Sequence, residues 1–134
     1  MRSRAKTAYV IDDDRMDRKF AKRTIGRSQL FERVELFDGP VAAMKHIEAG
    51  GDTPELIFLD INMPPVTGFE FLEKYGGQLQ ALDPVPAVVI VSTTVNPADL
   101  ERAAQFPLIK KFFSKPLSPE HITEANSLLG PCEP

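Results

Sequence analysis

ELIFLDINMPPVTG, residues 55–68, is the segment that decides the fold of this chain. Its continuous apolar run, residues 56–59, is typical of a strand that is buried on both faces, as in a parallel sheet. The run ends in Asp60, and the prolines that follow force a stiff loop, because the residue before a proline avoids helical geometry. We therefore expect Asp60 at the C-terminal end of a buried strand, where open α/β sheets place their chemistry.

The rest of the chain alternates short apolar runs with amphipathic stretches. The other predicted strands span residues 8–11, 34–37, 85–92 and 111–114. The predicted helices span residues 15–27, 41–48, about 67–77, 97–104, and a last stretch that opens at Ser118 and Pro119. Strand and helix thus alternate five times, which indicates a parallel sheet. The predicted fold class is α/β, a doubly wound five-stranded parallel sheet with helices on both faces.

Helical spacing predicts which side chains face the core. The expected inward residues are Met16, Phe20, Thr24, Ala21 and Ile25 in the first helix and Val41, Met44 and Ile47 in the second. Thr67 and Glu70 have the spacing of a capping box, and the glycines at 76–77 are expected to end the third helix. We expect a loose basic arm at residues 1–7 and the end of the last helix at Gly130–Pro131.

Length, charge and cysteine content limit the classes of function. A chain of 134 residues is expected to form a single domain, 1–134, with a core of about 8–129 and no output domain. The net charge of −3 gives no basic field for direct nucleic-acid binding. No apolar run reaches the roughly 18 residues of a membrane span. The single cysteine, Cys132, has no disulfide partner, so a cytoplasmic location is the expectation.

Polar side chains follow four of the predicted strands. Asp12 and Asp13 follow the first strand, Asp60 ends the third, Ser92 ends the fourth, and Lys115 follows the fifth. The C-terminal ends of parallel strands meet at one rim, so these groups are expected to lie together. Asp60 could attack a phosphoryl group as a nucleophile, with Lys115 neutralising charge and the Ser92 hydroxyl donating a hydrogen bond.

The same rim predicts a metal site. Three carboxylates close together repel one another unless a cation lies among them. Oxygen ligands suit a hard divalent ion, and Mg²⁺ is the expected one, held by Asp12, Asp13 and Asp60. The backbone carbonyl of Asn62 is a further candidate ligand.

Each of these residues also has a simpler explanation. The two acids before the first helix could be first-turn acids only, Ser92 could belong to a polar loop, and Lys115 could be a solvated surface lysine. Their common position at the ends of four strands favours one joint site over four separate accidents.

The full pattern resembles the receiver domain of two-component response regulators, over about residues 8–129. The resemblance rests on Asp12–Asp13, on LDINMPPVTG as a D-x-x-M-P-x-x-x-G loop, on the hydroxyl residues after the fourth strand, and on Lys115–Pro116. It implies a flavodoxin-like receiver fold with Asp60 as phosphoacceptor. It also implies Mg²⁺ on Asp12, Asp13 and the Asn62 carbonyl.

The resemblance implies further roles around the phosphoacceptor. Ser92 would be the switch hydroxyl and Phe112 the switch aromatic that turns inward with it. Lys115 would pair with the phosphoryl group, and Lys115–Pro116 would be a cis peptide. The segment Gln105–Ile109 departs from the family pattern, because it lacks the usual Gly-Ala turn.

The apolar residues in and beside Gln105–Ile109 have two possible locations, at the surface or in the core. Phe106, Leu108, Phe112 and Phe113 would form an apolar partner-binding or dimer surface, or they would point into the core. The second alternative is favoured for Leu108 and Phe113.

The implied function is a stand-alone response regulator receiver of a two-component phosphorelay. It would take a phosphoryl group from a histidine kinase or histidine phosphotransfer protein onto Asp60, in a Mg²⁺-dependent step, and switch a surface that a downstream protein binds. It would be a monomer or a phosphorylation-dependent dimer, and no enzyme beyond its own phosphotransfer and dephosphorylation. Shuttle, effector and phosphate sink remain open as roles.

Three other classes of function fit the sequence less well. The main alternative is a phosphate-independent, receiver-like interaction module. A phosphatase of the haloacid-dehalogenase kind is disfavoured, because it needs a second aspartate where Asn62 stands. Dinucleotide binding is excluded because carboxylates follow the first strand where glycines are needed.

Overall fold

The computed structural model describes residues 6–63, 66–93 and 96–129. The expectations for residues 1–5, the prolines at 64–65, the threonine at 94 and the tail from 130 with Cys132 lie outside these residues. The predicted arm is wrong at Thr7, which is the first residue of a buried strand. The last helix ends at Ser127, before the predicted stop at 130–131. Among the helices in the described ranges, none is long and apolar enough to cross a membrane.

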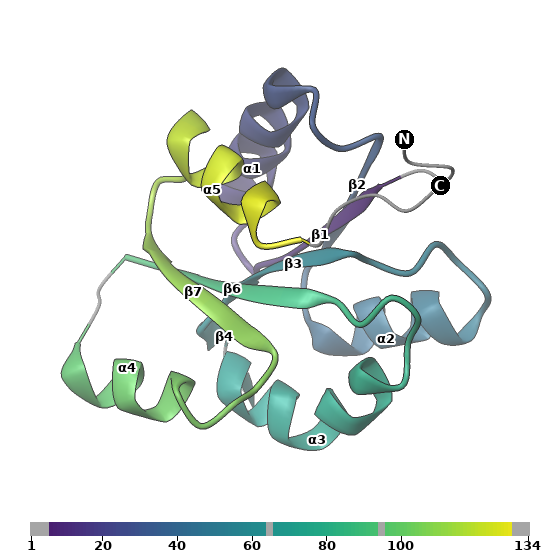
Figure 1. The fold of residues 1–134 in the computed structure, drawn as a ribbon, viewed down its shortest axis with the longest axis vertical. Coiled ribbons are helices and arrows are strands. Elements are labelled where there is room, and N and C mark those ends of the chain that lie inside the picture. Colours follow the sequence, from purple (N-terminus) through teal and green to yellow (C-terminus); the bar gives the residue numbers. More distant parts are fainter. Residues whose placement is uncertain (1–5, 64–65, 94–95, 130–134) are drawn as a thin grey trace.

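Five parallel strands form one sheet in the order β2-β1-β3-β6-β7 (Figure 1). The strands are β1 Thr7–Ile11, β2 Arg33–Phe37, β3 Leu56–Asp60, β6 Ala87–Ser92 and β7 Ile109–Ser114. The helices are α1 Arg15–Ser28, α2 Pro40–Glu48, α3 Gly68–Gln80, α4 Pro97–Ala103 and α5 Pro119–Ser127. A short antiparallel pair, β4 Asn62–Met63 and β5 Val66–Thr67, joins β3 to α3. The predicted fold class is confirmed.

Helices cover both faces of this sheet. Figure 1 shows α1 and α5 on one face and α2, α3 and α4 on the other. Each face has its own apolar cluster, and successive strand residues alternate between them: Val10 and Phe58 belong to the α1–α5 side, and Ile11 and Leu59 to the opposite side. This two-sided burial is why the strands are continuous apolar runs in the sequence.

The predicted inward face is wrong for three residues. Met16 is 70% exposed, Phe20 46% and Val41 55%. The predictions for Ala21 and Ile25 are confirmed, because these two residues are the ones that α1 buries. Successive residues turn by about 100° around a helix, so periodicity alone leaves two adjacent stripes hard to separate. In α2 the buried residues are Ala43 and Met44, and Val41, the second residue of the helix, points away from them.

The expectation that the glycines at 76–77 end the third helix is also wrong. Helix α3 continues to Gln80, and Leu79 beyond the glycines is fully buried. The burial of this turn outweighs the weak helix propensity of glycine. The predicted capping box of Thr67 and Glu70 is confirmed.

Two strand starts differ from their predicted positions. Strand β6 begins at Ala87 instead of Val85, which is 51% exposed and is flanked by prolines that cannot donate to a sheet. Strand β7 begins at Ile109, two residues early, because a register shift at Val88/Val89 lets Ile109 pair with β6.

Replacing Gly77 with alanine is expected to stabilise the protein. Gly77 is helical, and a Cβ there would meet nothing within 4 Å. The free energy of unfolding should rise by about 0.5–1 kcal/mol, measured by urea denaturation. Gly51→Ala is the matched contrast, because its Cβ would collide with the His46 ring and should lower stability. A lower free energy of unfolding in Gly77→Ala would contradict the assignment of Gly77 to an unobstructed position inside α3.

Candidate functional site

The site lies at the C-terminal ends of β1, β3, β6 and β7. The registers Ile11↔Leu59, Asp60↔Val91 and Ser92↔Ser114 align these ends across the sheet. The chain leaves β1 and β3 toward opposite faces, to α1 and α3, which is the switch point where doubly wound sheets bind ligands. The sheet therefore brings together the polar residues that the sequence places after four separate strands.

Three carboxylates form the centre of the site. Asp12, Asp13 and Asp60 each offer an oxygen atom, and these atoms lie within 4.8 Å of one another. Asp12 and Asp60 are buried, whereas Asp13 is exposed. The Asp14 backbone N–H donates to Asp12 Oδ1 at 2.9 Å, and the Arg18 guanidinium donates to the Asp12 carbonyl at 2.8 Å. The end of β1 is thus fixed by the first turn of α1.

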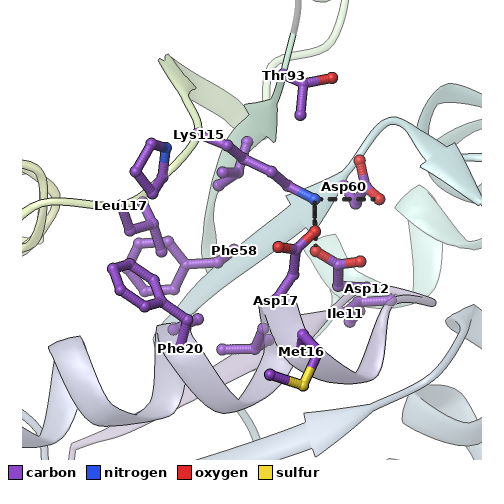
Figure 2. A pocket seen from close by; sticks show the side chains of 14 residues that line it. Ile11, Asp12, Met16, Asp17, Phe20, Phe58, Asp60, Thr93, Lys115 and Leu117 are labelled. Atoms are coloured by element: carbon purple, nitrogen blue, oxygen red, sulfur yellow. Dashed lines mark hydrogen bonds and ion pairs between the residues drawn. The ribbon is translucent and has the colours of Figure 1, made fainter.

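Lys115 supplies the positive charge of the site. Its Nζ atom lies 2.8 Å from Asp12 Oδ2, 2.8 Å from Asp17 Oδ2 and 3.6 Å from Asp60 Oδ2 (Figure 2). Its side chain is only 13% exposed, which excludes the solvated-surface explanation. Its backbone N–H donates to the Ser92 carbonyl at 2.8 Å, so the ladder between β6 and β7 fixes where the side chain starts.

Burial alone would lower the pKa of the Lys115 ammonium. The hydrogen bonds to Asp12 and Asp17 and the charge of Asp60 outweigh burial and hold this pKa above its ordinary value. Because the pKa is raised on folding, the ion pairs contribute their full stability below the pKa of an unfolded lysine and lose it only at more alkaline pH. Lys115 therefore remains a cation throughout the neutral range. The predicted cis peptide Lys115–Pro116 is confirmed.

The donor set fits a hard divalent cation. All three side chains of the acidic cluster offer carboxylate oxygens, and three such charges against one ammonium leave an excess of negative charge. Asp12, Asp13 and Asp60 would hold such an ion, and it would neutralise the excess negative charge of the cluster. Asn62 lies in β4 just beyond Asp60, and the role of its carbonyl stays a prediction.

Gly68 holds the loop after Asp60 against β3. Its backbone N–H donates to the Ile61 carbonyl at 2.8 Å. A Cβ at Gly68 would lie 2.8 Å from the Asp60 carbonyl oxygen, closer than such atoms approach. Glycine is therefore required here by the close approach of α3 to the strand that carries Asp60.

An apolar cavity of about 430 Å³ opens beside the acidic cluster. It lies between α1 and the segment 115–117, and Figure 2 shows Phe58 and Leu117 beside it. Met16 and Phe20, both exposed on α1, also line it. The site is thus flanked by an accessible apolar surface.

Ser92 and Phe112 occupy the neighbouring strands. Ser92 is 2% exposed at the end of β6, and Phe112 of β7 is half-buried against the apolar cluster on the α2–α4 side. Their roles as switch residues stay predictions.

The apolar side chains Phe106, Leu108 and Ile109 of the departing segment pack against the core, whereas Gln105 and Pro107 are exposed. The Phe106 ring stacks on Phe69 with centroids 5.7 Å apart, and the Arg102 guanidinium lies 4.8 Å from the same Phe69 ring. Leu108 and Phe113 are both 5% exposed, which confirms the favoured explanation for these two residues. The packing of Phe106 removes much of the apolar surface that motivated a dimer at this place.

Asp17 was missed as a site residue. Its position in the first turn of α1 predicts a helix-stabilising acid and nothing more. The available signal was its spacing: Asp17 follows Asp12 by five residues, on the helix turn that faces the same rim. Only the three-dimensional structure shows that Lys115, distant in sequence, reaches it.

Fold and site together define an α/β protein with an acidic, lysine-containing pocket at the C-terminal edge of its sheet. The sequence matches the family described as response regulator receiver domain over residues 8–127, and the chain belongs to this family.

Two relatives of the same description match this chain over part of their length. The chain is 30% identical over 107 residues to a protein-glutamate methylesterase/protein-glutamine glutaminase of Thiobacillus denitrificans, covering 80% of this chain and 28% of that protein. It is 36% identical over 84 residues to a protein of the same description from Burkholderia thailandensis, covering 63% of this chain and 21% of the relative. The chain thus spans less than a third of the length of these relatives.

Solved structures show the same fold. A two component response regulator from Cytophaga hutchinsonii superimposes with a TM-score of 0.84 at 24% identity, covering 93% of this chain and 96% of that one. Chemotaxis protein CheY4 of Vibrio cholerae gives a TM-score of 0.77 at 20% identity, covering 95% and 100%.

Proposed function

We propose that this chain is a phosphoacceptor that takes a phosphoryl group on Asp60 from a histidine kinase or histidine phosphotransfer protein. The observation that carries the proposal is the convergence of Asp12, Asp13, Asp60 and Lys115 at the switch point of a receiver fold. The relatives with methylesterase names contribute only their receiver-like part to this proposal. We propose that the described residues do not catalyse the turnover of a separate substrate. We also propose that the protein is located in the cytoplasm.

The proposed reaction moves the phosphoryl group between two side chains. An oxygen of the Asp60 carboxylate attacks phosphorus, the bond from phosphorus to the donor's imidazole nitrogen breaks, and that nitrogen recovers its electron pair. Bound Mg²⁺ would supply charge neutralisation at the acidic cluster and at the phosphoryl oxygens. Lys115 pairs with a phosphoryl oxygen, and the Ser92 hydroxyl donates to another. The product is an acyl phosphate on Asp60.

The apolar rim of the cavity suits the approach of the donor. Met16 and Phe20 are exposed one turn apart on α1, directly beside the pocket that holds Asp60. Exposed apolar side chains beside a reactive group are typical of a protein-binding surface. A donor that docks there would bring its phosphohistidine to the open side of the acidic cluster.

The signal would then reach a second protein through the α4–β7 side. Ser92 and Phe112 lie on adjacent strands, and a new bond from Ser92 to the phosphoryl group would shift the balance between two arrangements of this region. We propose that a downstream protein binds the shifted arrangement. Dimerisation on phosphorylation is a further outcome that sedimentation of the modified and unmodified chains would show.

The test is the intact mass of the protein after incubation with acetyl phosphate. With Mg²⁺ present we expect one phosphoryl adduct, stable in acid and labile in base. With a chelator in place of Mg²⁺ the adduct should be at least about tenfold less abundant, because the carboxylates then repel the anionic donor.

A negative result in this test would favour a different function. A folded chain that stays unmodified with acetyl phosphate, and also with phosphorylated histidine kinases, would favour the phosphate-independent interaction module.

A further inference from the structure

Asp17 binds Lys115 as closely as Asp12 does. Lys115 Nζ is 2.8 Å from each of these two carboxylates and 3.6 Å from Asp60 (Figure 2). The ammonium of this structure therefore leans toward α1 and away from the candidate phosphoacceptor.

The position of Asp17 is set by the start of α1. Asp14 caps this helix, accepting hydrogen bonds from the backbone N–H groups of Met16 at 2.8 Å and Asp17 at 3.1 Å. Ala21 and Ile25 anchor the same helix in the core. The Asp17 side chain is therefore not the cap, and it is presented on a fixed turn.

Lys115 comes from a different part of the fold. It follows β7, with its backbone hydrogen-bonded to Ser92, and it lies on the wall of the cavity opposite α1. The pair Asp17–Lys115 thus joins two segments that are 98 residues apart, at the polar end of the cavity.

We propose that Asp17 is a positioning residue that competes with the phosphoryl group for Lys115. This inference rests on the proposed function. Hydrogen bonds to Asp12 and Asp17, both at 2.8 Å, hold the ammonium 3.6 Å from Asp60 Oδ2, beyond hydrogen-bond distance. To pair with a phosphoryl group on Asp60, the ammonium shifts toward Asp60 and gives up its contact with Asp17. Asp17 therefore favours the unphosphorylated arrangement of the site.

The exposure of the Asp17–Lys115 ion pair limits how strongly Asp17 can oppose the binding of a phosphoryl group. The Asp17 side chain is 43% exposed, so solvent screens its attraction to Lys115. Ion pairs of this kind change an equilibrium by about twofold to fivefold. Asp17 is thus expected to tune the response and not to abolish it.

The test uses beryllofluoride, an anion that mimics a phosphoryl group on aspartate, with its affinity measured by calorimetry in saturating Mg²⁺. Asp17→Asn should bind it about twofold to fivefold more tightly than the unmodified chain. Asp17→Glu keeps the charge and should restore binding to near the starting value.

A double-mutant cycle separates competition for Lys115 from a general loss of negative charge. In a Lys115→Gln background, Asp17→Asn should tighten binding clearly less than it does when Lys115 is present. Asp99→Asn is the matched control, because Asp99 is also an acid in a first turn, that of α4, and its N–H bonds to a cap side chain, Asn96. Thermal unfolding of each variant verifies that it is folded.

The outcomes distinguish this inference from the function on which it rests. Unchanged or weaker binding in Asp17→Asn, or equal tightening with and without Lys115, would overturn the competition while leaving the phosphoacceptor intact. If the unmodified chain binds no beryllofluoride at all, both the proposed function and the role of Asp17 fall.

Discussion

Asp60→Asn is expected to remove the phosphoryl adduct completely. The amide that replaces the carboxylate is neutral and is a far weaker nucleophile, so the rate of modification should fall by at least about 100-fold. The measurement is the intact mass after incubation with acetyl phosphate and Mg²⁺, compared with the unmodified chain.

Loss of the fold should not explain this result. Lys115 pairs with three carboxylates, those of Asp12, Asp17 and Asp60, so removing the negative charge of Asp60 relieves repulsion among them. The variant should unfold at a temperature no lower than that of the unmodified chain. Asp83→Asn, an exposed carboxylate in the turn before β6, is the matched control and should keep the adduct. An adduct of normal yield in Asp60→Asn would exclude Asp60 as the acceptor.

Phe58→Ala is expected to give the largest loss of stability. Phe58 is 1% exposed in β3, the central strand of the sheet, and belongs to the apolar cluster beneath α1 and α5. Truncating a buried phenylalanine costs about 3–5 kcal/mol, which is a large part of the roughly 5–15 kcal/mol that holds a domain folded. Urea unfolding followed by circular dichroism measures this, since the chain has no tryptophan.

Phe20→Ala is the matched control for the core prediction. The same ring is removed, but Phe20 is 46% exposed at the mouth of the cavity, so the cost should stay below about 1 kcal/mol. Equal losses in the two variants would contradict the assignment of Phe58 to the core and Phe20 to the surface.

The strands were predictable because their sequence signal does not depend on contacts far away. A parallel strand buried on both faces is a short apolar run, and Leu56 to Leu59 shows it plainly. The rule that such strands end at one rim then brings Asp12, Asp60 and Lys115 together without any structural knowledge. The acidic cluster and its lysine were predictable for the same reason.

Helix faces and helix ends were less predictable, because tertiary contacts decide them. Met16 and Phe20 have the spacing of a buried stripe, but the sheet lies under Ala21 and Ile25. The glycines at 76–77 look like a stop signal, but the burial of Leu79 carries the helix past them. In both cases the sequence contains two competing signals, and the packing of distant segments selects one.

The ion pair of Asp17 with Lys115 shows a limit of another kind. Each residue has a sufficient local explanation, as a first-turn acid and as a lysine at the rim. The spacing of Asp17 after Asp12 places it near the rim, but its contact with Lys115 depends on how α1 and the segment after β7 meet above the sheet.

The most direct test of the central claim is to locate the modification in the chain. The protein is incubated with acetyl phosphate and Mg²⁺, treated with borohydride, which reduces an acyl phosphate to an alcohol, and digested for peptide mass spectrometry. The account predicts homoserine in place of Asp60, and aspartate unchanged at positions 12, 13 and 17. Reduction at one of those three positions, or phosphate retained on a serine or threonine instead, would contradict it.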